Sequence, residues 1–158
     1  MQKATLCFLI KGNPPDEILL GFKKAGFGAG KYNGIGGKVQ ANESVEAAAA
    51  RELEEETSVK VLEHDLQQVG HLTFRFPYKS DWDQVVHVFL VNMWEGEPVE
   101  SAEMKPGWYK LDEIPFERMW QDDAHWLPLV LAGQKVKASF TFQDDNETID
   151  KLQIETMA

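Results

Sequence analysis

Cysteine is almost absent from this 158-residue chain, in which Cys7 is the only one. A single thiol excludes an intramolecular disulfide framework, so nothing in the sequence requires an oxidising compartment. No apolar run approaches the roughly eighteen residues needed to cross a bilayer. The short apolar stretch 4–10 lacks a small-residue cleavage site and is expected to form a strand, not a signal peptide. These absences predict a cytoplasmic protein without a membrane partner.

Positive charge is also scarce, because 16 Lys and Arg residues face 26 Asp and Glu residues, for a net charge of −10. Such a surface repels a nucleic acid polymer, and no Lys/Arg-rich stripe offsets the repulsion. If the ligand carries phosphates, a divalent metal is the obvious source of local positive charge. The length fits one domain over residues 1–158, which we expect to be a monomer.

Apolar patterning and turn residues predict strands separated by two helices. The strands are expected over 5–10, 17–22, 68–78, 84–94, 108–111, 136–142 and 148–154, and the helices over 44–59 and 123–131. Ser44 or Asn42 can cap the first helix, and Asp122 or Asp123 the second. Residues 26–37 form a glycine-rich loop. This order predicts an α/β (α+β) domain with a mixed β-sheet held between helices.

The helix over 44–59 places Glu52, Glu55 and Glu56 at positions i, i+3 and i+4. Side chains at this spacing share one helix face, where three carboxylates repel one another. A hard divalent cation offsets that repulsion, and oxygen ligands favour Mg²⁺, with Mn²⁺ as a substitute. The alternative from these residues alone is an ordinary solvated acidic face.

A longer pattern surrounds these glutamates. Gly37 is followed after five residues by Glu43 and, after seven more, by the stretch 51–59, which reads Arg-Glu-Leu-Glu-Glu-Glu-Thr-Ser-Val. The pattern resembles the Nudix box, a glycine, glutamate and Arg-Glu-aliphatic-any-Glu-Glu series at this spacing. Ser58 departs from it, since the family has a glycine there that ends the helix with positive φ. The departure affects the turn and no metal ligand.

The resemblance implies a Nudix fold with a catalytic loop–helix–loop motif and hydrolysis of a diphosphate link by water. The implied catalytic residues are Arg51, Glu52, Glu55 and Glu56. The implied metal set is Gly37, Glu52, Glu55, Glu56 and Glu103. Arg51 is expected to pair with Glu43 or Glu55 and so hold the acidic face rigid.

Three stretches outside the box, 21–34, 98–106 and 114–126, are similar to the MutT-homologue branch of animal enzymes that hydrolyse oxidised purine nucleoside triphosphates. By position, this resemblance implies that Asn33, Asp122 and Asp123 read the purine edge and that Trp120 stacks on the base. The remaining implied substrate-binding residues are Thr5, Lys23, Phe27, Phe74 and Phe142.

Two adjacent carboxyls repel, so one of the pair Asp122 and Asp123 can hold a proton at neutral pH. A protonated acid beside a carboxylate offers a donor and an acceptor, which suits more than one purine edge. The alternative is structural: both acids cap the second helix, and Trp120 and Trp126 pack the core. Two departures bear on base preference, namely Tyr32 in place of the usual tryptophan and an insertion-like segment, 78–83.

Other motifs are weaker. Residues 25–32 resemble a P-loop only in part, since Ala25 and Tyr32 occupy its first glycine and its Ser/Thr positions. The four histidines lack a paired zinc-ligand spacing. The sequence therefore predicts a Mg²⁺-dependent pyrophosphohydrolase that sanitises the nucleotide pool by converting oxidised purine nucleoside triphosphates to monophosphates plus pyrophosphate. The alternatives are a general Nudix hydrolase of nucleoside triphosphates or diphosphate derivatives, and a catalytically silent nucleotide-binding Nudix domain.

Overall fold

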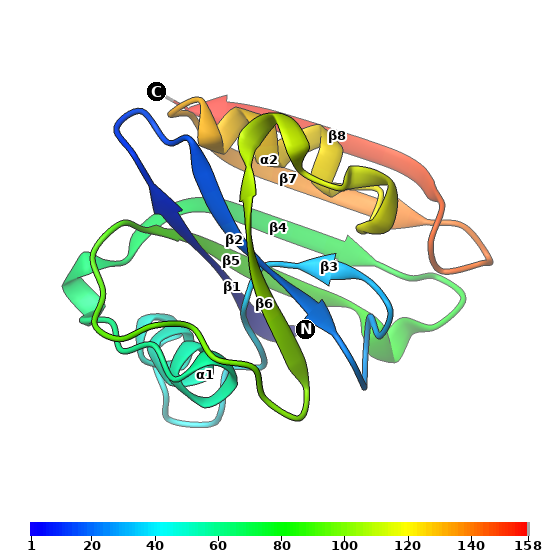
Figure 1. The fold of residues 1–158 in the computed structure, drawn as a ribbon. Coiled ribbons are helices and arrows are strands. Elements are labelled where there is room, and N and C mark those ends of the chain that lie inside the picture. The colour runs from blue at the N-terminus through cyan, green and yellow to red at the C-terminus, as the bar shows by residue number, and fades with distance from the viewer. Residues whose placement is uncertain (158) are drawn as a thin grey trace.

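The computed structural model describes residues 1–157, which contain eight strands and two α-helices (Figure 1). The strands are β1 (Gln2–Lys11), β2 (Glu17–Lys23), β3 (Tyr32–Asn33), β4 (Gln67–Arg75), β5 (Gln84–Val91), β6 (Met104–Lys110), β7 (Lys135–Phe142) and β8 (Ile149–Met157). The helices are α1 (Val45–Thr57) and α2 (Asp123–Leu131). Four short 3₁₀ turns are η1 (Glu63–Asp65), η2 (Ser80–Trp82), η3 (Leu111–Glu113) and η4 (Phe116–Arg118). None of the helices within residues 1–157 is long and apolar enough to cross a membrane.

The sheet is mixed, with strand order β3-β2-β1-β5-β4-β7-β8 and β6 paired to β2. β1 runs parallel to β5 over eight residue pairs, from Gln2 opposite Gln84 to Leu9 opposite Val91. β4 and β7 form the second parallel pair, and the other neighbours are antiparallel. A parallel pair needs a long crossover, and α1 lies on the connection between β1 and β5.

The two helices cover opposite faces of the sheet. Successive side chains of a strand point to opposite faces, and in β1 the alternate residues belong to different cores. Phe8 and Ile10 pack in the cluster that contains Trp126 of α2, whereas Leu9 packs in the cluster that contains Leu53 of α1. Figure 1 shows α1 beside β1 and α2 along β7, in agreement with their contacts. The predicted fold class, a mixed sheet between helices, is therefore confirmed.

Serine residues stand at both ends of α1, with Ser44 before it and Ser58 after it. The Ser44 side chain accepts a hydrogen bond from the Ala47 N–H, so Ser44 and not Asn42 is the N-cap. Ser58 ends the helix at φ +67°, the left-handed conformation that the family's glycine adopts easily. Ser58 therefore forms the same helix-ending turn as glycine would, although the left-handed conformation is less favourable for a residue with a side chain.

Several strand boundaries differ from the prediction. β6 begins at Met104, four residues before the predicted start, because it pairs with the whole length of β2. The two-residue strand β3 lies inside the predicted glycine-rich loop, paired with β2. Helix α2 has the predicted bounds.

Candidate active site

The loop before α1 lies directly against the parallel strand β1. Backbone hydrogen bonds join the Thr5 N–H to the Gly37 carbonyl at 2.8 Å and link Cys7 and Ile35 in both directions. At Gly36 the two backbones are so close that a Cβ atom would lie 1.8 Å from the Thr5 carbonyl oxygen. Only glycine allows this approach, and it brings the start of the Nudix-like motif to the edge of β1.

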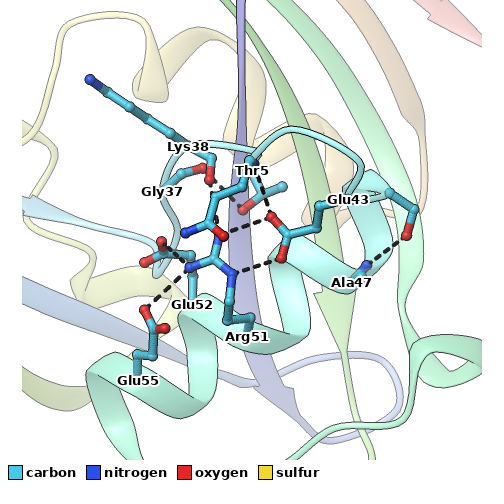
Figure 2. A network of polar contacts seen from close by, with 10 residues as sticks. Thr5, Gly37, Lys38, Glu43, Ala47, Arg51, Glu52 and Glu55 are labelled. Atoms are coloured by element: carbon cyan, nitrogen blue, oxygen red, sulfur yellow. Dashed lines mark hydrogen bonds and ion pairs between the residues drawn. The ribbon is translucent and has the colours of Figure 1, made fainter.

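Arg51 of α1 gathers the acidic side chains around it (Figure 2). Its Nε and Nη2 donate to the two oxygens of Glu43 at 2.7 and 3.0 Å, a bidentate pair. Its Nη1 donates to Glu52 at 2.9 Å and to Glu55 at 3.2 Å, and Nη2 also reaches the Lys38 carbonyl. The predicted partners Glu43 and Glu55 are thus both engaged. The Arg51 hydrogen bonds hold the pKa of Glu43 below its usual value.

The Glu52 carboxylate occupies the space that a side chain at position 37 would need. A Cβ atom on Gly37 would lie 2.5 to 2.7 Å from the Glu52 carboxyl atoms. One Glu52 oxygen accepts from Arg51. The loop therefore leaves room for a carboxylate held between it and the helix, which gives the glycine of the motif a steric reason.

Glu56 differs from its neighbours because it points into the protein. It is 5% exposed, whereas Glu55 is exposed. Burial raises the pKa of Glu56 to about 7, against the opposing charge of Lys23. The charges of Glu52 and Glu103 add to that rise, so both carboxylates act on Glu56. Its Oε2 atom is buried and has no hydrogen-bond partner among the described residues.

These features fit a divalent cation. A buried carboxylate oxygen without a partner is costly unless a cation or donor satisfies it, and all-oxygen ligands suit a hard metal. Within residues 1–157 no three acidic, histidine or cysteine side chains are already grouped closely enough to hold an ion. Glu52 and Glu55 each direct one oxygen to Arg51, and the second oxygen of each has no side-chain partner of its own in the described part of the chain.

A cavity of about 290 Å³ extends from this loop to the N-terminus of α2. Its lining includes Lys23 and residues 36–38 of the loop before α1, together with Trp120 and the acid pair 122–123. Of the predicted substrate-binding residues, the cavity is lined by Thr5, Lys23, Phe27, Asn33, Phe74, Trp120, Asp122, Asp123 and Phe142. The structure therefore brings this whole predicted set to one cavity, whereas Glu52, Glu55 and Glu56 of α1 do not line it.

The acid pair Asp122 and Asp123 is buried, at 3% and 2% exposure. Asp122 accepts a hydrogen bond from the indole Nε1 of Trp126 at 2.8 Å. Asp122 occupies the predicted N-cap position of α2, but its side chain makes no capping bond there. Trp126 itself is fully buried in the core, as the structural alternative expected for this tryptophan.

Burial perturbs both carboxyls. It raises the pKa of Asp122 to about 6, against the lowering effect of the Trp126 hydrogen bond. Burial, followed by repulsion from Asp122, raises the pKa of Asp123 well above its usual value. Asp123 Oδ2 also lacks a partner among residues 1–157. The pair is therefore able to keep a proton near neutral pH and to present both a donor and an acceptor to the cavity.

The apolar wall of the cavity is aromatic. Phe27 stacks on Trp120 with ring centroids 5.3 Å apart. Phe76 stacks on Phe142 at 4.7 Å and also lines the cavity. Gln84 is a further lining residue. The sequence reasoning missed Phe76 and Gln84; the alternation of β4, which places Phe74 and Phe76 on one face, was the available signal for Phe76.

Two other expectations have different outcomes. Asn33 lines the cavity, and its Oδ1 accepts from the Gly34 N–H at 2.9 Å. Tyr32 does not line it, because its ring packs on Phe22 and Tyr109 instead. Tyr32, which stands where the family usually has tryptophan, therefore makes no direct contact with the cavity.

This combination of a mixed sheet between helices and an acidic loop–helix–loop defines a known class. The family profile described as NUDIX domain matches residues 2–130, and the chain belongs to this family. It is 44% identical over 146 residues to the oxidized purine nucleoside triphosphate hydrolase of Mus musculus, covering 92% of each chain. It is 45% identical over 150 residues to the Danio rerio protein of the same name, covering 95% of this chain and 94% of that one.

Among solved structures, a MutT protein from Bacillus halodurans superimposes with a TM-score of 0.83 at 24% sequence identity, covering 98% of both chains. At that identity the similarity shows the fold. The resemblance to the animal MutT-homologue branch is confirmed by the two vertebrate relatives.

Proposed function

We propose that this protein hydrolyses oxidised purine nucleoside triphosphates to the monophosphate and pyrophosphate. The observation that carries the proposal is the single cavity that joins the loop before α1 to the buried acid pair. A nucleotide bound with its base at Asp122 and Asp123 places its phosphates toward Lys23 and the acidic helix. The similarity to the two vertebrate relatives over nearly their whole length supports this substrate class.

At the phosphate end, Glu52, Glu55 and Glu56 would hold Mg²⁺, with Glu103 and the Gly37 backbone as further ligands. When bound, the metal polarises the phosphoryl oxygens, lowers the pKa of the attacking water and neutralises the leaving pyrophosphate. Arg51 keeps two of these carboxylates in place through hydrogen bonds. Lys23 lines the cavity close enough to Glu56 to affect its pKa and supplies a fixed positive charge for the phosphates.

At the base end, Trp120 and Phe27 provide apolar ring surface and the acid pair provides polar recognition. A buried group that loses its partner costs binding energy, so the unpaired Asp123 oxygen favours a base that donates a hydrogen bond to it. Oxidation of a purine at carbon 8 converts a ring nitrogen from acceptor to donor. The donor and acceptor of the acid pair therefore suit an oxidised purine edge.

The test is a Mg²⁺-dependent pyrophosphate-release assay on 8-oxo-dGTP, 2-hydroxy-dATP and dGTP, with wild-type protein and Glu56→Gln. We expect a preference for the oxidised substrates and a fall in kcat of about 100-fold or more in the variant, with nucleotide binding retained. Glu54→Gln is the matched control, since Glu54 is exposed on the same helix.

The outcomes separate the parts of the proposal. Hydrolysis without preference for the oxidised bases would refute the substrate class and leave a general Nudix hydrolase. Unchanged turnover in Glu56→Gln would refute the metal assignment. No release from any of the three substrates would refute the hydrolytic function proposed for this pocket.

A further inference from the structure

The turn η2 between β4 and β5 brings Trp82 to the mouth of the cavity. Trp82 lines the cavity, and its ring meets Phe27 edge to face at 4.8 Å and Phe76 at 5.6 Å. The turn is fixed to the end of β4, because Asp83 Oδ1 accepts from the Phe76 N–H at 2.6 Å. Lys79 Nζ lies over the Trp82 ring, 4.8 Å from its centroid. Trp82 is therefore a held side chain and not a loose surface residue.

Phe27, by contrast, depends on its neighbours for its position. It is 43% exposed and lies between Gly26 and Gly28, which both have left-handed backbone at φ +82° and +81°. Glycines on both sides give this segment little stiffness of its own. The Phe27 ring lies almost parallel to Trp120, with 19° between the planes, and its edge contacts are with Trp82 and Phe76. Trp82 is the nearer of these two edge contacts, at 4.8 Å against 6.4 Å for Phe76.

We propose that Trp82 is a positioning residue of the base pocket, which holds Phe27 over Trp120 and so strengthens binding of the base. Asp122 and Asp123 are 3% and 2% exposed, whereas Phe27 is 43% exposed, and all three line the same cavity as Trp82. The contact from Trp82 therefore fixes the more exposed part of the cavity wall. This inference rests on the proposed function and adds one residue to its base pocket.

The experiment compares wild-type protein with Trp82→Ala, Trp82→Phe and the control Tyr78→Ala. Tyr78 belongs to the same segment but is 69% exposed and does not line the cavity. Three quantities are measured: the Kd of 8-oxo-dGMP without metal, and kcat and KM for 8-oxo-dGTP with Mg²⁺. We expect Trp82→Ala to raise Kd and KM about two- to tenfold, the effect of losing an aromatic pair, with kcat within about twofold of wild type.

Trp82→Phe is expected to recover most of the affinity, and Tyr78→Ala to match wild type. A Kd for Trp82→Ala equal to that of Tyr78→Ala would overturn the inference, as would a loss confined to kcat. Trp82→Leu, which keeps apolar bulk without a ring, makes the same test if the alanine variant does not fold. Wild-type protein that neither binds nor hydrolyses the oxidised nucleotide would refute the proposed function together with this inference. An active wild type with an unaffected Trp82→Ala refutes the inference alone.

Discussion

Replacement of Asp122 by asparagine tests the electrostatics of the acid pair through the stability of the protein. Asparagine keeps an oxygen that accepts the hydrogen bond from Trp126 Nε1, and it removes a carboxyl that burial makes difficult to ionise. The change is nearly isosteric, so packing around the site is retained. We expect Asp122→Asn to be more stable than wild type at neutral pH, although it weakens substrate binding.

The sign and size follow from the raised pKa. An acid whose pKa is higher in the folded than in the unfolded state binds its proton more tightly when folded, so stability falls as pH rises between the two values. For Asp122 that interval runs from 3.8 to about 6, and about two pKa units correspond to about 3 kcal/mol. The variant therefore gains up to about 3 kcal/mol above pH 6, and the gain vanishes below pH 4.

Urea unfolding at pH 4, 5, 6 and 7.5 measures this difference directly. Asp144→Asn, a change at an exposed carboxyl in the turn after β7, is the control and is expected to match wild type at each pH. A variant no more stable than wild type at pH 7.5 would refute the burial argument. A gain of the same size at pH 4 and pH 7.5 would show that it arises from packing and not from ionisation.

Three further outcomes are expected. Arg51→Lys loses the bidentate contact to Glu43 and is expected to lower kcat/KM about 10- to 100-fold in the pyrophosphate-release assay; an unchanged value would contradict the positioning role. Gly37→Ala displaces the Glu52 carboxylate and is expected to reduce kcat about 100-fold with little change in Tm. A large loss of Tm with a normal kcat would contradict this role of Gly37. Ser58→Gly relieves the left-handed backbone at φ +67° and is expected to raise the free energy of unfolding by about 0.5–1 kcal/mol, measured in urea; a destabilised variant would oppose the reasoning.

The sequence predicted the acidic helix and its surroundings well, because those features depend on local spacing. The N-cap at Ser44, one of two predicted candidates, and the pairing of Arg51 with Glu43 and Glu55, predicted as alternatives, follow from a short stretch of chain. Ser58 was expected to alter the turn after the helix, and it adopts the left-handed conformation instead. The fold class followed from the same kind of pattern. Helix α2 was also predicted with its observed bounds.

The mouth of the cavity could not be predicted in this way. Trp82 contacts Phe27 only because η2 turns back toward the glycine-rich loop, a contact between segments about 55 residues apart in the chain. The strand β3 was missed for a similar reason, because its two residues are fixed by pairing with β2 and not by their own propensity. The orientation of Tyr32 away from the cavity depends on the ring of Tyr109, which sequence spacing does not reveal.

The guanidinium of Arg51 has a consequence for how the protein folds. It pairs with Glu43, Glu52 and Glu55 from within the chain, so its single positive charge offsets part of the repulsion among these carboxylates without an external cation. Small metal domains that lack such an internal counter-ion are unfolded until the metal arrives. Arg51 is such an internal counter-ion, so we expect α1 to form before the metal binds.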